Sequence, residues 1–271
     1  MRRRCNAPRP DANRTLSVIA VFNQKGGVGK TTTTLNVSVA VAKRGLAPVA
    51  IDLDPQAHLT LAFGIRAFAK GDSCYSFFAE GKPLAGMLRQ TPQGVRLLPG
   101  SPDLSKVDAL HASDAGISGK LRQGIAAMIE ETQQRGPVFI DCCPMLGVLT
   151  LNALIAADSV LIPVSADYLS LQGVHRLDSA LNVLEQRLKR KFVRRVVITR
   201  YDARRRLAAG VQEELVRRYG SNLCNTRIVE NVALAESPMY GKDVFSQSPA
   251  SPGARDYRAL TEELLSTGFF G

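Results

Sequence analysis

Short apolar runs alternate with longer amphipathic segments along most of this chain. Runs of strand length occupy 18–22, 47–53, 95–98, 138–141, 157–164, 192–199 and 223–229. Helical periodicity begins after 32 and recurs at 59–63, 74–78, 116–135, 169–188, 207–219 and 254–265, with a Ser/Pro-rich loop expected at 246–253. Strands that alternate with helices, without an internal repeat, predict an α/β fold with a doubly wound, mostly parallel sheet flanked by helices.

A glycine-rich stretch at 23–32, NQKGGVGKTT, lies between the first predicted strand and the first predicted helix. Backbone N–H groups in such a turn can wrap a polyphosphate. The spacing matches the phosphate-binding pattern Gly-x4-Gly-Lys-Thr, except that Gln24 replaces the first glycine. The phosphate cradle would consist of Gly26, Gly27, Val28, Gly29, Lys30, Thr31 and Thr32.

Each polar residue of this loop has an expected role. Lys30 should reach the β- and γ-phosphates, the Thr31 hydroxyl should bind Mg²⁺, and Thr32 should support the α-phosphate. Lys25 is not needed to build the cradle, and its ammonium could reach the phosphates of its own subunit or of a facing one. The alternative, a glycine-rich turn with incidental lysines, does not account for the complete Gly-Lys-Thr-Thr.

Two predicted strands end in aspartate, and ligands of parallel α/β sheets bind at the carboxyl ends of strands. Asp54, in the sequence Asp-Leu-Asp-Pro-Gln, could orient or deprotonate an attacking water, or hold the water shell of the metal. Asp141 would hold Mg²⁺ through water. The loop and the two carboxylates together predict an ATP site. Its metal-binding residues would be Thr31, Asp54 and Asp141, and its catalytic residues would be Lys25, Lys30 and Asp54.

The composition is that of a soluble chain with a core. The 271 residues are 45% hydrophobic, and no apolar run approaches the roughly 18 residues that span a bilayer. Residues 1–14 carry five Arg and one Asp and are expected to be a disordered basic tail before a single domain at 15–271. Five cysteines without a Cys-x-x-Cys pair favour a reducing cytoplasm.

The net charge of +11 is concentrated in the tail and in residues 187–206, which hold ten Lys/Arg and one Asp. A cluster of this kind is typical of a surface that binds phosphate backbones, although a solvated helix end would also be basic. The candidate DNA-binding residues are Lys189, Arg190, Lys191, Arg194, Arg195, Arg204, Arg205 and Arg206.

The motifs together resemble the ParA/MinD family of deviant-Walker P-loop ATPases, and the ParA (Soj-like) branch matches best. The resemblance rests on 25–32 (KGGVGKTT), 52–56 (DLDPQ) and 141–144 (DCCP) followed by 149–154 (LTLNAL), and it runs from about Ser17 onward. It implies a Mg²⁺- and ATP-dependent homodimer in which Lys25 touches the nucleotide of the partner. Asp54 would be the hydrolysis residue, with Gln56 in the first switch and 142–147 as the second.

The resemblance also implies a function. Such proteins bind DNA without sequence preference and position or segregate a cargo, which can be a chromosome, a plasmid or a protein complex. A ParB-like or other cargo adaptor stimulates their slow ATP hydrolysis. This chain would accordingly be cytoplasmic and nucleoid-associated, with a membrane partner not expected.

Three positions depart from the family pattern. Cys143 replaces a proline that is common in the second switch, which predicts a looser loop. Glu230 and Ala233 stand where partitioning relatives commonly carry arginine, while Arg204 falls where a DNA-contacting arginine would lie.

Three other functions compete with this one. A MinD-like membrane regulator is disfavoured because 257–271 has few basic residues. An amidating or ring-closing synthetase of related fold is disfavoured because no substrate pocket beyond the nucleotide site can be identified, and a nitrogenase-like reductase because adjacent Cys142 and Cys143 do not suit a cluster.

Overall fold

The computed structural model describes residues 16–66, 71–111 and 115–271, so the predicted tail at 1–14 lies outside the described part. Its strands are β1 (Val18–Val21), β2 (Val49–Asp52), β3 (Arg89–Gln90), β4 (Arg96–Leu98), β5 (Val138–Asp141), β6 (Ser159–Ser165), β7 (Val193–Tyr201) and β8 (Leu223–Val229). They form one sheet in the order β3-β4-β2-β5-β1-β6-β7-β8, parallel except between β3 and β4. The predicted doubly wound, mostly parallel sheet is confirmed.

Helices connect the strands and cover the sheet. They are α1 (Lys30–Lys43), α2 (His58–Ala62), α3 (Cys74–Glu80), α4 (Val107–Leu110), α5 (Lys120–Thr132), α6 (Val148–Ala156), α7 (Tyr168–Leu188), α8 (Arg206–Tyr219), α9 (Val232–Glu236), α10 (Val244–Gln247) and α11 (Pro252–Ser266). Sequence periodicity did not predict α4, α6, α9 or α10. The loop expected at 246–253 is shorter, because α10 extends to Gln247 and α11 begins at Pro252.

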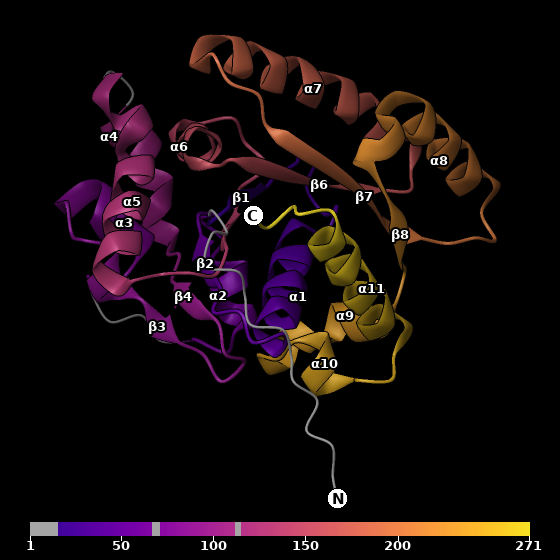
Figure 1. Ribbon diagram of the computed structural model, residues 1–271, viewed down its shortest axis with the longest axis horizontal. Coiled ribbons are helices and arrows are strands. Elements are labelled where there is room, and N and C mark those ends of the chain that lie inside the picture. The colour runs from indigo at the N-terminus through magenta and orange to yellow at the C-terminus, as the bar shows by residue number, and fades with distance from the viewer. Residues whose placement is uncertain (1–15, 67–70, 112–114) are drawn as a thin grey trace, which may run out of the picture.

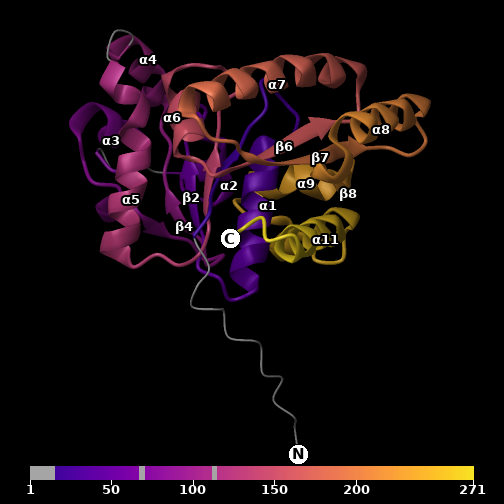
Figure 2. The same cartoon turned by 45° about the horizontal axis from the view of Figure 1, so that its top comes forward.

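The sheet separates two hydrophobic cores. Alternate residues of β1 enter different cores, with Val18 and Ala20 on one side and Ile19 and Val21 on the other. Figures 1 and 2 show α5, α6, α7 and α8 on the first side and α1 and α11 on the second. Because both faces are covered, the central strands are apolar throughout, which explains why they could be found as continuous runs.

Strand β1 lies at the centre of the sheet, between β5 and β6. Val21, its last residue, is in register with Asp141, and Asp141 is in register with Asp52. The glycine-rich loop and both strand-ending aspartates therefore meet at one edge of the sheet, as the sequence predicted. Ligands of open α/β sheets bind in this position.

The end of the sequence packs into the second core. Phe269 and Phe270 are 2% and 5% exposed, and the Phe270 ring lies edge-on to Phe139 of β5 with centroids 5.7 Å apart. These aromatic side chains do not present an apolar face to a membrane surface. No helix of the described residues is both long and apolar enough to cross a bilayer.

Candidate functional site

The glycine-rich loop forms a cradle at the start of α1. Gly27 and Gly29 have φ angles of 74° and 87°, in the left-handed region that other residues rarely adopt. Gly29 is the N-cap of α1, so the free N–H groups of the first helical turn border the cradle. A helix N-terminus of this kind favours anions, and phosphate oxygens suit it.

Lys30 is placed to meet a negative charge in this cradle. The residue is only 7% exposed, and its Nζ donates a hydrogen bond of 2.9 Å to the carbonyl of Lys25. Burial lowers the pKa of Lys30, while the neighbouring carboxylate of Asp141 opposes that shift. A polyphosphate in the cradle would supply the counter-charge that this buried ammonium lacks.

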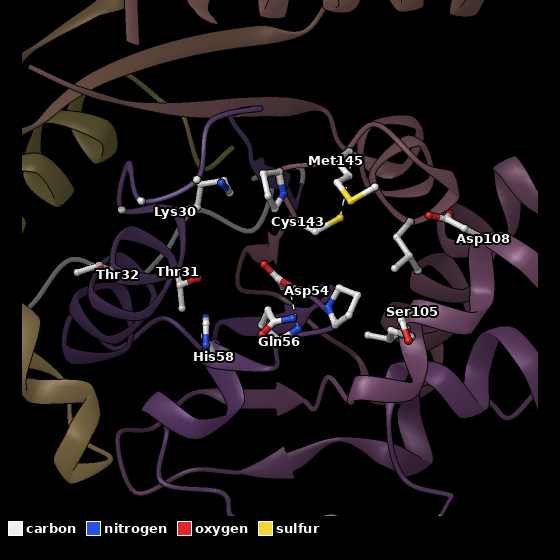
Figure 3. Close-up of a pocket in the computed structure, with 17 residues that line it drawn as sticks. Lys30, Thr31, Thr32, Asp54, Gln56, His58, Ser105, Asp108, Cys143 and Met145 are labelled. Atoms are coloured by element: carbon white, nitrogen blue, oxygen red, sulfur yellow. Dashed lines mark hydrogen bonds between the residues drawn. The ribbon is translucent and has the colours of Figure 1, made fainter. Parts of the chain in front are cut away.

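A cavity of about 780 Å³ opens in front of the loop. Its walls come from the loop itself, from residues 54–58 after β2, from residues 104–108 and from residues 143–149 after β5. Figure 3 shows Asp54 near the middle of this cavity, with Lys30 and Thr31 on one side and Met145 and Asp108 on the other. Both predicted switches, which include Gln56 and Cys143, therefore face the same space.

Thr31 and Asp141 fit a magnesium ion. The Thr31 hydroxyl donates to Asp141 Oδ2 over 2.7 Å, and the Thr34 hydroxyl donates to Oδ1 over 3.2 Å. Asp141 is fully buried, and this burial, together with nearby Asp52, raises the pKa of its carboxyl well above the usual range. Such a carboxylate is stabilised by a cation, and oxygen donors from one or two side chains plus substrate phosphates are typical of Mg²⁺ sites. The described residues hold no separate cluster of metal-ligating side chains.

The two aspartates after β2 have different surroundings. Asp52 is fully buried and accepts hydrogen bonds from the Thr60 hydroxyl (2.6 Å) and the Thr60 N–H (2.8 Å), which fixes the start of α2. Its burial raises the pKa to about 6, although these hydrogen bonds act in the opposite direction. Asp54 lines the cavity, and among the described residues its carboxylate accepts only the Gln56 N–H, over 2.9 Å. Asp52 is thus a positioning residue, and Asp54 is the carboxylate available to a ligand.

Lys25 does not line the cavity of its own loop. Its Nζ lies 2.5 Å from Asp167 Oδ1 and 3.0 Å from Ser170 Oγ, at the start of α7. Burial alone would raise the pKa of Asp167, but hydrogen bonds from Lys25, Ser165 and the Ser170 N–H outweigh it and lower that pKa to about 2. The second lysine of the loop is therefore held outside the cradle, beside the mouth of the site.

The second switch is anchored by Asp108, a residue that no sequence motif singles out. Asp108 of α4 accepts a hydrogen bond of 2.7 Å from the N–H of Val148, the first residue of α6. A Cβ at Gly147 would lie 2.4 Å from the Asp108 carboxylate. Within the loop, the Thr150 hydroxyl lies 3.3 Å from Cys143 Sγ and donates to the Met145 carbonyl over 2.6 Å. These bonds give Cys143 a fixed place, and the greater mobility predicted for it stays a prediction.

Gly147→Ala should destabilise the protein because the new methyl group meets the Asp108 carboxylate. We expect a loss of about 2 kcal/mol in the free energy of unfolding, measured by urea denaturation. In an Asp108→Ala background, which itself removes the α6 cap at a cost of about 1 kcal/mol, the glycine substitution should add little. Gly173→Ala on α7, where nothing lies within 4 Å, serves as the control. Equal losses in both backgrounds would contradict the assigned contact.

A second cavity of about 330 Å³ lies on the other side of the loop. Gly27, Gly29 and Thr32 line both cavities, and Arg200 and Glu230 belong to the wall of the second. A nucleotide whose phosphates bind to the loop could therefore place its base and ribose in either of these two cavities, within a single subunit.

Two of the arginines predicted to bind DNA have partners within the fold. The Arg190 guanidinium donates to the carbonyls of Ala157 (2.7 Å) and Ile155 (2.6 Å), at the end of α6. Arg194 is 15% exposed and pairs with Glu185 at 2.8 Å and Asp178 at 3.5 Å. Both side chains hold the fold together, so the geometry does not support them as contacts to DNA.

The remaining basic residues form two groups at opposite ends of β7. Exposed Lys189 and Lys191 precede the strand, and Arg195, which donates to the Ser221 carbonyl, lies within it. Arg204 and Arg205 follow the strand and are 89% and 63% exposed. Because β7 is parallel to β6 and β1, only the second group lies at the edge that carries the glycine-rich loop. Arg206 begins α8, and its side chain is not among those described.

Comparisons with known proteins identify the relatives of this chain. Residues 16–193 match a family model described as "AAA domain". The chain is 37% identical to the chromosome-partitioning ATPase Soj of Thermus thermophilus over 92% of its own length and 95% of that protein. It is 31% identical to the chromosome partitioning protein ParA of Myxococcus xanthus, over 92% and 87% of the two chains.

Solved structures show the same arrangement of elements. A cobyrinic acid a,c-diamide synthase of Mycobacterium smegmatis, with a bound ATP analogue and magnesium, superimposes with a TM-score of 0.78 at 29% identity, over 93% of this chain and 95% of that one. The cell division ATPase MinD of Pyrococcus furiosus superimposes with a TM-score of 0.74 at 24% identity, over 93% and 100%. This chain belongs to the ParA/MinD family of P-loop ATPases and, within it, to the Soj-like partitioning branch.

Proposed function

We propose that this ATPase forms a homodimer around Mg-ATP, binds DNA without sequence preference and positions or segregates a cargo. A ParB-like or other cargo adaptor would stimulate hydrolysis and release the protein from the nucleoid. The observation that carries the proposal is the position of Lys25, whose ammonium lies at Asp167 and Ser170 and outside the cradle that Lys30 occupies. A cation in that place could exchange its contact with Asp167 for the nucleotide of a facing subunit.

Exposed apolar side chains near the mouth of the site support the dimer. Met145 is 70% exposed, and Tyr168 and Leu169, next to the partner of Lys25, are 57% and 68% exposed. Large apolar residues at these exposures are common singly, but several beside one opening are typical of an interaction surface. A second subunit would cover them and close the nucleotide site.

Side chains of the cavity account for hydrolysis of ATP. Lys30 and the N–H groups of the loop would bind the phosphates, and Thr31 and Asp141 would hold Mg²⁺. When bound, the ion would neutralise charge on the phosphate oxygens. Asp54 projects into the cavity and would orient or deprotonate the attacking water. With only the Gln56 N–H bound to it, this carboxylate has acceptor capacity left for that water.

DNA binding is supported by exposed arginines at the edge that carries the nucleotide loop. Arg204 and Arg205 project from the segment between β7 and α8, so a dimer that forms across the nucleotide would bring two such segments together. Lys189 and Lys191 lie at the opposite end of the strand and would add charge there.

The proposal is tested by titrating fluorescent duplex DNA with the protein and ATP, ADP or no nucleotide, at about 50 and 200 mM salt. Binding should require ATP and weaken at the higher salt, since phosphate contacts are salt-sensitive. A folded, ATP-loaded protein that ignores DNA at the lower salt would overturn it. The M. smegmatis relative keeps a synthetase as second candidate, which would instead consume ATP only with a small-molecule acceptor.

A further inference from the structure

We propose that Glu230 acts as a resident competitor of phosphate, which sets how tightly the arginines after β7 can hold a DNA backbone. The inference rests on the proposed function, since it concerns the strength of that DNA contact. Its basis is a compact charge cluster that joins the segment after β7 to the end of β8, and that also reaches the second cavity beside the glycine-rich loop.

Glu230 lies between two arginines. Its Oε1 accepts a hydrogen bond of 3.0 Å from Arg200, and its Oε2 accepts one of 3.3 Å from Arg205. Each carboxylate oxygen thus accepts a hydrogen bond from one guanidinium group. Two oxygens of a single phosphate could accept hydrogen bonds from the same two groups. Arg200 and Arg205 are 60% and 63% exposed, so an external anion can reach the same groups.

Asp202 completes the cluster. It accepts two bonds of 2.9 Å from Arg204 and lies 3.4 Å from Arg205, and the Arg204 bonds lower its pKa to about 2. Two carboxylates therefore face three arginines, which leaves one net positive charge. Asp202 is only 12% exposed and also accepts the Arg204 N–H, so it is built into the turn. Glu230, at 39%, is the acid that can move aside.

The backbone holds the pair of Arg200 and Glu230 in place. Arg200 has a φ angle of 51°, an uncommon left-handed conformation for a residue with a side chain. The Glu230 N–H donates to the Tyr201 carbonyl over 3.0 Å, which continues the pairing of β7 with β8. Both residues also line the cavity that shares Gly27 and Gly29 with the phosphate cradle. Whatever enters that cavity meets the same ion pair that a DNA phosphate would meet.

The strength of these contacts fits a competitor that weakens binding without preventing it. Exposed ion pairs contribute little, at most about 1 kcal/mol each, because water and salt screen them. A DNA phosphate can therefore displace Glu230, but breaking the existing ion pairs makes the free energy of DNA binding less favourable. Removal of the Glu230 charge should release Arg200 and Arg205 and strengthen binding.

The test compares Glu230→Gln with Glu236→Gln in the full-length protein at saturating ATP. Glu236, exposed on α9, pairs with no arginine in the described part of the chain, so both variants lose one negative charge and only the first frees arginines. Glu230→Gln should bind duplex DNA about fivefold more tightly than the wild type, and Glu236→Gln less than about twofold. In an Arg205→Ala background the gain from Glu230→Gln should fall, because only Arg200 is left to be freed, and in an Arg200→Ala/Arg205→Ala background it should largely disappear.

The outcomes separate this inference from the proposed function. If the wild type binds DNA and the two glutamine variants have equal affinities, the inference fails and the function stands. If Glu230→Gln binds DNA and the wild type does not, Glu230 prevents binding outright, which overturns both the proposed function and a competitor that only weakens binding. If none of the variants binds DNA, both proposals are overturned. Circular dichroism of each variant checks that the fold is retained.

Discussion

Asp54→Ala is expected to reduce ATP turnover by about 100-fold or more, while ATP stays bound and the dimer remains on DNA. Asp54 lines the cavity, and its backbone N–H donates to Oδ1 of buried Asp52 over 3.2 Å. Alanine removes the carboxylate that projects into the cavity, but leaves the loop residues that would bind the nucleotide. The variant should therefore accumulate as an ATP-loaded species, measurable by phosphate release and by size-exclusion chromatography with light scattering.

Asp103→Ala is the matched control, since that exposed acid pairs with Lys106 on the surface and should leave turnover unchanged. Normal hydrolysis by Asp54→Ala would show that another group activates the water. Loss of ATP binding would instead assign Asp54 to the metal site, together with Thr31 and Asp141. The two measurements thus distinguish the roles in proton transfer and in metal binding that the sequence left open.

Lys25→Ala is expected to keep ATP binding and to abolish the ATP-dependent dimer, with a fall of at least about tenfold in DNA affinity. Lys30 and the helix N-terminus bind the phosphates of the same subunit, whereas the Lys25 ammonium lies outside that cradle. Loss of the Lys25 ammonium should therefore affect only the properties that need a second subunit, namely dimerisation and DNA binding. Light scattering with ATP gives the mass, and DNA titration gives the affinity.

A second variant tests whether Lys25 acts only through its partner on α7. Asp167→Asn removes the ion pair but keeps a side chain that can cap α7. If the role of Lys25 lay in holding α7, Asp167→Asn would lose the dimer as Lys25→Ala does. We expect the asparagine variant to dimerise with ATP. Lys43→Ala, at the far end of α1, controls for the loss of one positive charge.

The nucleotide site could be predicted because its determinants are local. The loop, Asp54 and Asp141 each follow a short apolar strand, and parallel strands bring their carboxyl ends together. Asp108 could not be predicted in the same way. Its carboxylate caps α6 from a position 40 residues earlier in the chain, and neither the four-residue α4 nor the nine-residue α6 shows a clear periodicity.

The basic run shows what local sequence leaves out. Residues 187–206 are contiguous and strongly positive, so the sequence favoured one binding surface. It gave no sign that Arg194 would meet Asp178 and Glu185, or that Arg190 would meet the carbonyls of α6. A run of basic residues can be recognised from the sequence. The residues that pair with those side chains are distant in the sequence and become adjacent only in the fold.

The length of β7 limits how many DNA phosphates one subunit can neutralise. Its nine residues separate the two basic groups by about 26 Å, well beyond a Debye length of about 8 Å at physiological salt. The two basic groups therefore do not add to each other's electrostatic attraction for DNA. A duplex bound at one group loses few further counterions because of the other group. Two or three phosphates per subunit would contribute about −2 to −3 per subunit to the slope of log affinity against log salt, about a third of what the full basic run suggests. One continuous basic segment of the sequence therefore forms two small, separate basic surfaces in the fold.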